Sequence, residues 1–93
     1  MIIKTIADFA LALDNGAYAW PGGYPTYFLC QDGAALSFEA ALQNKAEILD
    51  ALVSYSDNDW KVIAFEINYE DPNLYCEHTG KRIESAYAEE DAA

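Results

Sequence analysis

A turn signal between two apolar runs, followed at once by a helix start, most constrains how this chain can fold. The runs are Thr26–Cys30 (TYFLC) and Ala34–Ser37 (AALS), and Gln31-Asp32-Gly33 separates them. Polar residues and a glycine between β-prone segments predict an antiparallel hairpin. Ser37 is a favourable N-cap, so the second strand is expected to lead directly into a helix. The chain is therefore expected to combine helices with an antiparallel sheet.

Two segments have the apolar spacing of amphipathic helices. The first begins after Thr5, which is suited to an N-cap, and ends at Asn15-Gly16. The second is predicted as one long helix that follows Ser37 and continues to residue 56. The residues expected on the buried faces are Ile6, Phe9, Ala10 and Leu13 in the first helix, and Phe38, Ala41, Leu42, Leu49, Leu52 and Val53 in the second.

The segment 61–70 (KVIAFEINYE) alternates between apolar and polar side chains, which predicts a half-buried strand. Residues 74–76 and 82–87 are predicted to form two further short strands around a turn. In the long strand, Ile63, Phe65, Ile67 and Tyr69 are expected to face the core, and Glu66, Asn68 and Glu70 to face solvent.

The segment 17–27 (AYAWPGGYPTY) contains two prolines and two glycines. Such residues disfavour both a helix and a central strand. Its aromatic side chains, Tyr18, Trp20 and Tyr24, are expected to cover the core. Together these elements predict one α+β domain over residues 1–88, with two helices against a small antiparallel sheet, and an acidic tail over residues 89–93.

The charge is strongly one-sided, with 16 acidic residues against 5 basic ones and a net charge of −11. The chain lacks the basic stripe needed to neutralise phosphates, so direct binding of nucleic acid is not expected. The acidity has two explanations that the sequence leaves open, namely solubility or a partner with a basic surface. The apolar run near residue 1 is too short and too charged to span a membrane, and a signal peptide is not expected. With two cysteines, the chain is expected to be a cytoplasmic protein with reduced thiols.

The stretch Leu74–Tyr87 (LYCEHTGKRIESAY) resembles one half of a zinc knuckle. A structural zinc site needs four ligands, usually in two Cys-x-x-Cys pairs. Here the four corresponding positions hold Ser37, Ala40, Cys76 and Thr79, so only one is a cysteine. The hairpin is therefore predicted to be zinc-ribbon-like or treble-clef-like without a metal, and no cofactor is expected. Gly80 is expected to provide a positive φ angle in the turn.

Most of the chain after Gly16 resembles a group of small uncharacterised proteins of phages and bacterial mobile elements. The residues that carry this resemblance are AYAWPGGYPTYFLCQDGAALSFEA and NYEDPNLYCEHTGKRIESAYAEED. Some members of the group have cysteines in both pairs. The resemblance implies a zinc-ribbon-like α+β fold and a mobile-element setting, and it implies no activity. Anti-CRISPR proteins and other inhibitors of host defence are an analogy in size, charge and setting.

Acidic side chains at regular spacing are the leading candidates for a binding site. Glu39 and Glu47 would lie about 12 Å apart along one continuous helix. Such surfaces can mimic a nucleic-acid backbone and block a nucleic-acid-binding host defence complex. A solvated acidic face on an adaptor module is the alternative, and an enzyme that uses Cys76 and His78 is not favoured. The predicted partner-binding residues are Glu39, Glu47, Asp50, Glu66, Glu70, Asp71, Glu77 and Glu84.

Overall fold

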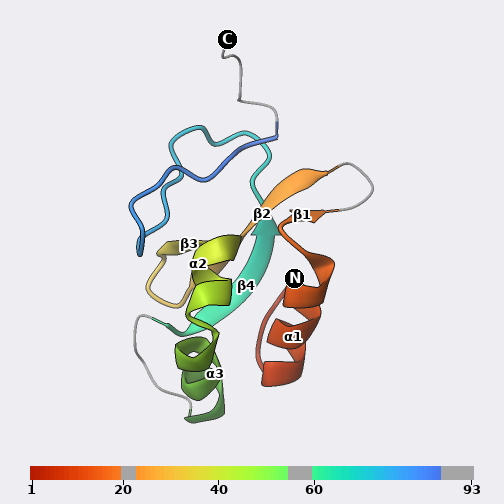
Figure 1. The fold of residues 1–93 in the computed structure, drawn as a ribbon, viewed down its shortest axis with the longest axis vertical. Coiled ribbons are helices and arrows are strands. Elements are labelled where there is room, and N and C mark those ends of the chain that lie inside the picture. Colours follow the sequence, from red (N-terminus) through yellow and green to blue (C-terminus); the bar gives the residue numbers. More distant parts are fainter. Residues whose placement is uncertain (20–22, 55–59, 87–93) are drawn as a thin grey trace.

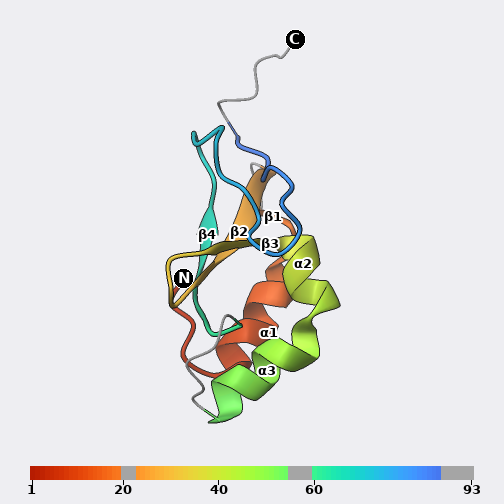
Figure 2. The same cartoon turned by 90° about the vertical axis from the view of Figure 1, so that its left-hand side faces the viewer.

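The computed structural model describes residues 1–19, 23–54 and 60–86, and it has an α+β fold (Figure 1). Within these residues there are three helices and an antiparallel sheet of four strands. Figure 2 shows the helices together on one side of the sheet. The elements, in chain order, are α1 (Ile6–Asn15), β1 (Tyr18–Ala19), β2 (Tyr24–Cys30), β3 (Ala35–Ser37), α2 (Phe38–Gln43), α3 (Lys45–Ser54) and β4 (Val62–Ile67).

Strand β2 is the centre of the sheet. It pairs with β3 in the predicted hairpin and with β4 on its other side, so that Phe28 is opposite both Leu36 and Phe65. The prediction that proline would exclude a central strand here is wrong, because Pro25 lies inside β2. Pro25 is tolerated near the start of the strand, where its carbonyl oxygen accepts a hydrogen bond from the Asn68 amide at 2.9 Å.

Phe28 connects the sheet to the helices. Its ring is fully buried, and its centroid lies 5.3 Å from that of Phe9 in α1 and 4.8 Å from that of Phe65 in β4. The ring centroid of Phe38, at the start of α2, lies 6.2 Å from that of Phe28. Around it pack further buried residues from every layer, including Ile3, Ala12, Cys30, Leu36, Ala40, Ala41, Ile48, Leu52, Val62, Cys76 and Ile83.

Both predicted helix starts are confirmed by their capping hydrogen bonds. The Thr5 hydroxyl accepts from the Asp8 amide, and the Asp8 carboxylate accepts from the Thr5 amide, which forms a capping box. The Ser37 hydroxyl accepts from the Ala40 amide at 3.1 Å. In α1, Phe9 is buried as predicted, whereas Ile6 and Ala10 are exposed and Ala12 is buried instead.

The predicted long helix is in fact two helices separated at Asn44. The Asn44 side chain donates to the Ala40 carbonyl oxygen at 2.9 Å, and its backbone amide bonds the same oxygen. Asparagine competes for backbone groups in this way, which favours a helix end. The break changes the buried face: Leu42 and Val53 are exposed, and the buried residues of the two helices are Ala40, Ala41, Ile48, Ala51 and Leu52.

The alternation predicted for residues 61–70 holds only in part. Phe65 is buried and Glu66 is exposed, but Ile63 and Tyr69 are also exposed, and Asn68 is 4% exposed. A register shift between Leu29 and Cys30 interrupts the pairing of β2 with β4. Strand β4 ends at Ile67, so the two-residue period does not continue into the turn that follows.

The C-terminal segment is a hairpin-like loop in place of the two predicted strands. One bridge joins Tyr75 to Arg82, and the Gly80 φ angle of 74° confirms the predicted positive φ. Tyr18, expected to cover the core, is 52% exposed, while Tyr24 is half-buried against Tyr69. Trp20, Tyr87 and the tail at 89–93 lie outside the described residues. None of the described helices is long and apolar enough to cross a membrane.

Candidate functional site

The loop at residues 76–80 closes on the N-terminus of α2. The Glu77 amide donates to the Ala35 carbonyl oxygen at 2.8 Å, which ties the loop to β3. The Gly80 amide donates to the Cys76 carbonyl oxygen at 2.8 Å and tightens the turn. Cys76 is thereby placed against Ser37, although the two residues are distant in sequence. The structure thus brings together three of the four positions that correspond to the ligands of a zinc knuckle. These are Ser37, Cys76 and Thr79.

The Cys76 thiol is 1% exposed and lies among hydrogen-bond donors. Its burial acts to raise its pKa, but the amides and hydroxyls of Ser37 and Thr79 donate to the sulfur and stabilise the thiolate. The net effect is a Cys76 pKa below its ordinary value. These donors occupy positions that metal ligands hold in a zinc knuckle. Ser37 and Thr79 therefore interact directly with the sulfur.

The lowered pKa predicts a pH-dependent contribution of Cys76 to stability. A group whose pKa is lower in the folded state contributes stability above its unfolded-state pKa, and loses it as pH falls through the folded-state pKa. The free energy of unfolding of the wild type, relative to Cys76→Ala, is therefore expected to rise between about pH 7 and about pH 10. Urea denaturation of both proteins across this range measures the difference. A difference that is constant or falls with pH would contradict the assignment.

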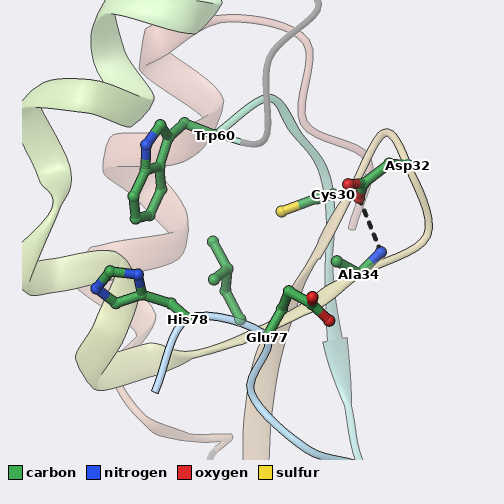
Figure 3. Close-up of a pocket in the computed structure, with 7 residues that line it drawn as sticks. Cys30, Asp32, Ala34, Trp60, Glu77 and His78 are labelled. Atoms are coloured by element: carbon green, nitrogen blue, oxygen red, sulfur yellow. Dashed lines mark hydrogen bonds between the residues drawn. The ribbon is translucent and has the colours of Figure 1, made fainter. Parts of the chain in front are cut away.

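A cavity of about 260 Å³ lies between the β2–β3 turn, Trp60 and the start of the 76–80 loop (Figure 3). The Cys30 side chain points toward it from the end of β2. Leu36 and Ala34 also line it. Trp60 and His78 lie side by side on the opposite wall, with ring centroids 5.1 Å apart in an edge-on contact. We call this cavity the hairpin pocket.

Two carboxylates line the hairpin pocket, Asp32 and Glu77. Asp32 Oδ1 accepts a hydrogen bond from the Ala34 amide at 3.0 Å, which orders the turn. Glu77 is exposed on the loop that follows Cys76. No group of three or more His, Cys, Asp or Glu side chains among residues 1–19, 23–54 and 60–86 is arranged to hold a metal ion.

The two residues of the hypothetical Cys76–His78 pair have different neighbours in the structure. The Cys76 sulfur interacts with Ser37 and Thr79, while the His78 ring lies against Trp60 in the hairpin pocket. The thiol that faces this pocket is that of Cys30, which is 1% exposed. Both cysteines are outside any disulfide.

All eight predicted partner-binding carboxylates are exposed, and they come from separate segments of the chain. Glu39 lies on α2, while Glu47 and Asp50 lie on α3, so the break at Asn44 removes the continuous helix that their spacing assumed. We call these three residues the helical acids. The other five, Glu66, Glu70, Asp71, Glu77 and Glu84, lie on β4 and the segment that follows it, and we call them the C-terminal acids.

Two of the C-terminal acids act on Tyr27. Glu66 is directly opposite Tyr27 in the pairing of β2 with β4. The pKa of Tyr27 is raised by burial and further by the negative charges of Glu66 and Asp71. Glu84 accepts a hydrogen bond from the Tyr18 hydroxyl at 2.8 Å, and this bond raises the Tyr18 pKa. The C-terminal acids are thus mixed with tyrosines.

Few of these acids are neutralised by residues that the structure describes. In the part of the chain that the structure describes, the one carboxylate in an ion pair is Glu66, whose Oε2 lies 3.6 Å from the Met1 amino group. The helical acids and Glu70 and Glu77 form no ion pair with a described residue. Their charge is therefore available to a partner.

Sequence reasoning missed the hairpin pocket as a site. Asp32 is predicted only as a turn residue, and no site was expected at Cys30 or Trp60. No local pattern links Asp32, Trp60 and Glu77, because they come from three separate segments. A tryptophan after an acidic loop is the one signal that was present.

Comparisons of the chain with protein-family models, curated proteins and solved structures gave no match. The resemblance to phage and mobile-element proteins, and the zinc-ribbon-like character of the hairpin, therefore stay predictions.

Proposed function

We propose that this protein is an acidic, non-catalytic inhibitor that occupies the basic surface of a nucleic-acid-binding partner. The observation that carries the proposal is the set of exposed carboxylates that have no cationic partner within the described residues. The partner class follows from charge complementarity, and a bacterial host defence complex, met in the cytoplasm, is the candidate that the anti-CRISPR analogy suggests.

The physical argument starts from the cost of the charge. A net charge of −11 on a chain of this size disfavours the compact state through self-repulsion. A basic partner surface relieves this repulsion when the complex forms, and it accelerates association by long-range attraction. Attraction beyond a Debye length of about 8 Å is screened at physiological salt, so clustered acids contribute more than scattered ones.

The C-terminal acids are the better candidate for the interface. Tyrosine is enriched at protein interfaces, where its ring adds contact area and its hydroxyl adds a hydrogen bond. Tyr18, Tyr69 and Tyr75 are each about half exposed, and Tyr18 is hydrogen-bonded to Glu84. The helical acids are on surfaces where the exposed large apolar residues are Leu42 and Val53.

Charge reversal of the two sets tests the proposal. Changing Glu66, Glu70 and Glu84 together to lysine is expected to slow association with a captured basic partner by about ten-fold or more, because steering is lost. Changing Glu39, Glu47 and Asp50 to lysine alters the net charge equally and serves as the matched control. Single substitutions are expected to change affinity by only about 0–1 kcal/mol.

The partner is first captured from nuclease-treated bacterial lysate at low salt and must be displaced by added double-stranded DNA or RNA. Association and dissociation rates of the variants are then measured on the purified partner. If neither triple reversal changes the affinity or its salt dependence, the proposal is wrong.

An adaptor module that binds through its aromatic residues is a second candidate function. The exposed tyrosines favour it, and it predicts a different pattern from the acidic inhibitor. For an adaptor, a Tyr69→Ala/Tyr75→Ala variant is expected to abolish partner binding, whereas charge reversal has little effect. The same rate measurements distinguish the two candidates.

A further inference from the structure

We infer that the hairpin pocket binds an organic cation, a guanidinium or ammonium group carried on a short apolar stem. This inference deepens the proposed function and rests on it only for the source of the cation, since an arginine or lysine side chain of the basic partner and a free small cation have the same chemistry. None of the helical acids and none of the tyrosines lines the pocket. Glu77 is the one C-terminal acid in its lining.

The two carboxylates of the pocket, Asp32 and Glu77, can accept hydrogen bonds from a ligand. The backbone amides on its rim are already used, since the Ala34 amide donates to Asp32 Oδ1 and the Glu77 amide donates to the Ala35 carbonyl oxygen. The Asp32 and Glu77 carboxylates line the same cavity. Two negative charges with their neighbouring amides engaged exclude an anion and favour a cation that donates several hydrogen bonds.

The apolar part of the pocket fits the rest of such a ligand. Trp60 and His78, whose rings are in edge-on contact, form an aromatic wall that suits the methylene groups of a side-chain stem. Leu36, Ala34 and the buried Cys30 thiol add further apolar surface for this stem. Figure 3 shows Asp32 and Glu77 on the side away from the two rings.

The size of the pocket favours a small ligand group. Its volume of about 260 Å³ is just below the range of about 300–1,000 Å³ that is typical of pockets for drug-sized molecules. It is therefore suited to one side chain or one small amine. A bare metal ion is disfavoured because the described residues contain no three-ligand arrangement.

Chemical-shift mapping tests the inference on the whole protein. The probes are the blocked peptide acetyl-Gly-Arg-Gly-amide, the same peptide with neutral citrulline in place of arginine, and the free amine agmatine. The arginine peptide is expected to shift the amides of Asp32, Ala34, Glu77 and His78 and the Trp60 indole in a saturable way. The citrulline peptide is expected to shift none of them. Equal shifts with citrulline, or shifts spread over all exposed acids, would overturn the inference.

Paired variants separate a specific site from general attraction. Asp32→Asn/Glu77→Gln removes two charges at the pocket. The side-chain carbonyl oxygen that replaces the Asp32 carboxylate can still accept from the Ala34 amide, so the fold is expected to remain. This variant is expected to lose about ten-fold or more in affinity for the arginine peptide. Glu39→Gln/Glu47→Gln removes the same charge elsewhere and is expected to change affinity by less than about two-fold. An equal loss in both variants would show that the pocket has no specific role.

The two sources of the cation give different results. Tighter binding of the arginine peptide than of agmatine assigns the pocket to a partner's side chain, and the reverse assigns it to a free cation. If the arginine peptide saturates the pocket while charge reversal leaves partner binding unchanged, the proposed function fails and the pocket assignment stands. If partner binding depends on the acids but no probe saturates the pocket, only the pocket assignment fails.

Discussion

Replacing Phe28 by alanine is expected to lower the free energy of unfolding by about 3–5 kcal/mol. The ring is fully buried and contacts Phe9, Phe38 and Phe65, so the truncation leaves a cavity at the junction of α1, α2 and β4. Because domains of this kind are stable by only about 5–15 kcal/mol, the loss is a large fraction of the total. Urea denaturation followed by circular dichroism measures the change in midpoint.

Phe28→Leu is the matched control for this prediction. Leucine keeps an apolar side chain in the site and removes less volume, so the expected loss is about 1–2 kcal/mol. Its midpoint should therefore lie between those of the wild type and Phe28→Ala. If Phe28→Ala costs less than about 1 kcal/mol, Phe28 does not have the central role in the core that its ring contacts indicate.

Asn68→Ala is expected to lower the free energy of unfolding by about 2–4 kcal/mol, because a buried polar side chain joins two segments. Asn68 Nδ2 donates to the Asp71 and Glu84 carbonyl oxygens at 3.0 Å, and Oδ1 accepts from the Asp71 amide at 3.2 Å. The Ile83 carbonyl oxygen lies 3.4 Å from the same nitrogen. Removing the side-chain amide leaves these partly buried backbone groups without their hydrogen-bond partner.

The effect of Asn68→Ala is expected to be local as well as global. The Ala86 amide, which bonds the Asn68 carbonyl oxygen, should exchange its hydrogen faster, since the segment around residues 83–86 loses its attachment. NMR measures the hydrogen-exchange rate of the Ala86 amide separately from those of the other amides. Asn73→Ala, at an exposed position in the turn that follows Asn68, is the control. Its free energy of unfolding should stay within about 0.5 kcal/mol of that of the wild type. Equal effects of the two substitutions would show that Asn68 has no special role.

Asn68→Asp extends the same argument to pH. A carboxylate at this position would face several carbonyl oxygens, and charge–dipole repulsion would disfavour the ionised form in the folded state. The pKa of such a carboxyl would be raised on folding, so the variant is expected to recover part of its stability as pH falls below about 5.

The local features of the fold could be read from the sequence because each depends on groups a few residues apart. Thr5 and Ser37 cap helices through backbone amides three residues later. The hairpin depends on a short turn, in which Gly33 has a φ angle of 91° that favours glycine. The α+β class follows from these elements and from the apolar pattern that surrounds them.

Other features were decided by contacts between distant segments. The central position of β2 depends on a partner strand on each side, which offsets the amide missing at Pro25. The helix break at Asn44 allows Ala40, Ala41 and Ile48 all to pack in the core. The residue spacing of one continuous helix does not predict this set of buried residues. Asn68 was predicted to face solvent because its neighbours alternate, and it is buried because backbone groups from residues 71, 83 and 84 converge on it.

The candidate sites also depend partly on the sequence alone and partly on the tertiary structure. The sequence by itself determined the excess of acids and the exposure of the eight predicted carboxylates, because ionised side chains lose hydration when they are buried. Only the tertiary structure decided which acids lie beside tyrosines, and that Ser37 and Thr79 donate to the Cys76 sulfur. It alone placed Asp32, Trp60 and Glu77 around one cavity, because the chain must fold back through β2, β3 and the C-terminal loop before these side chains meet.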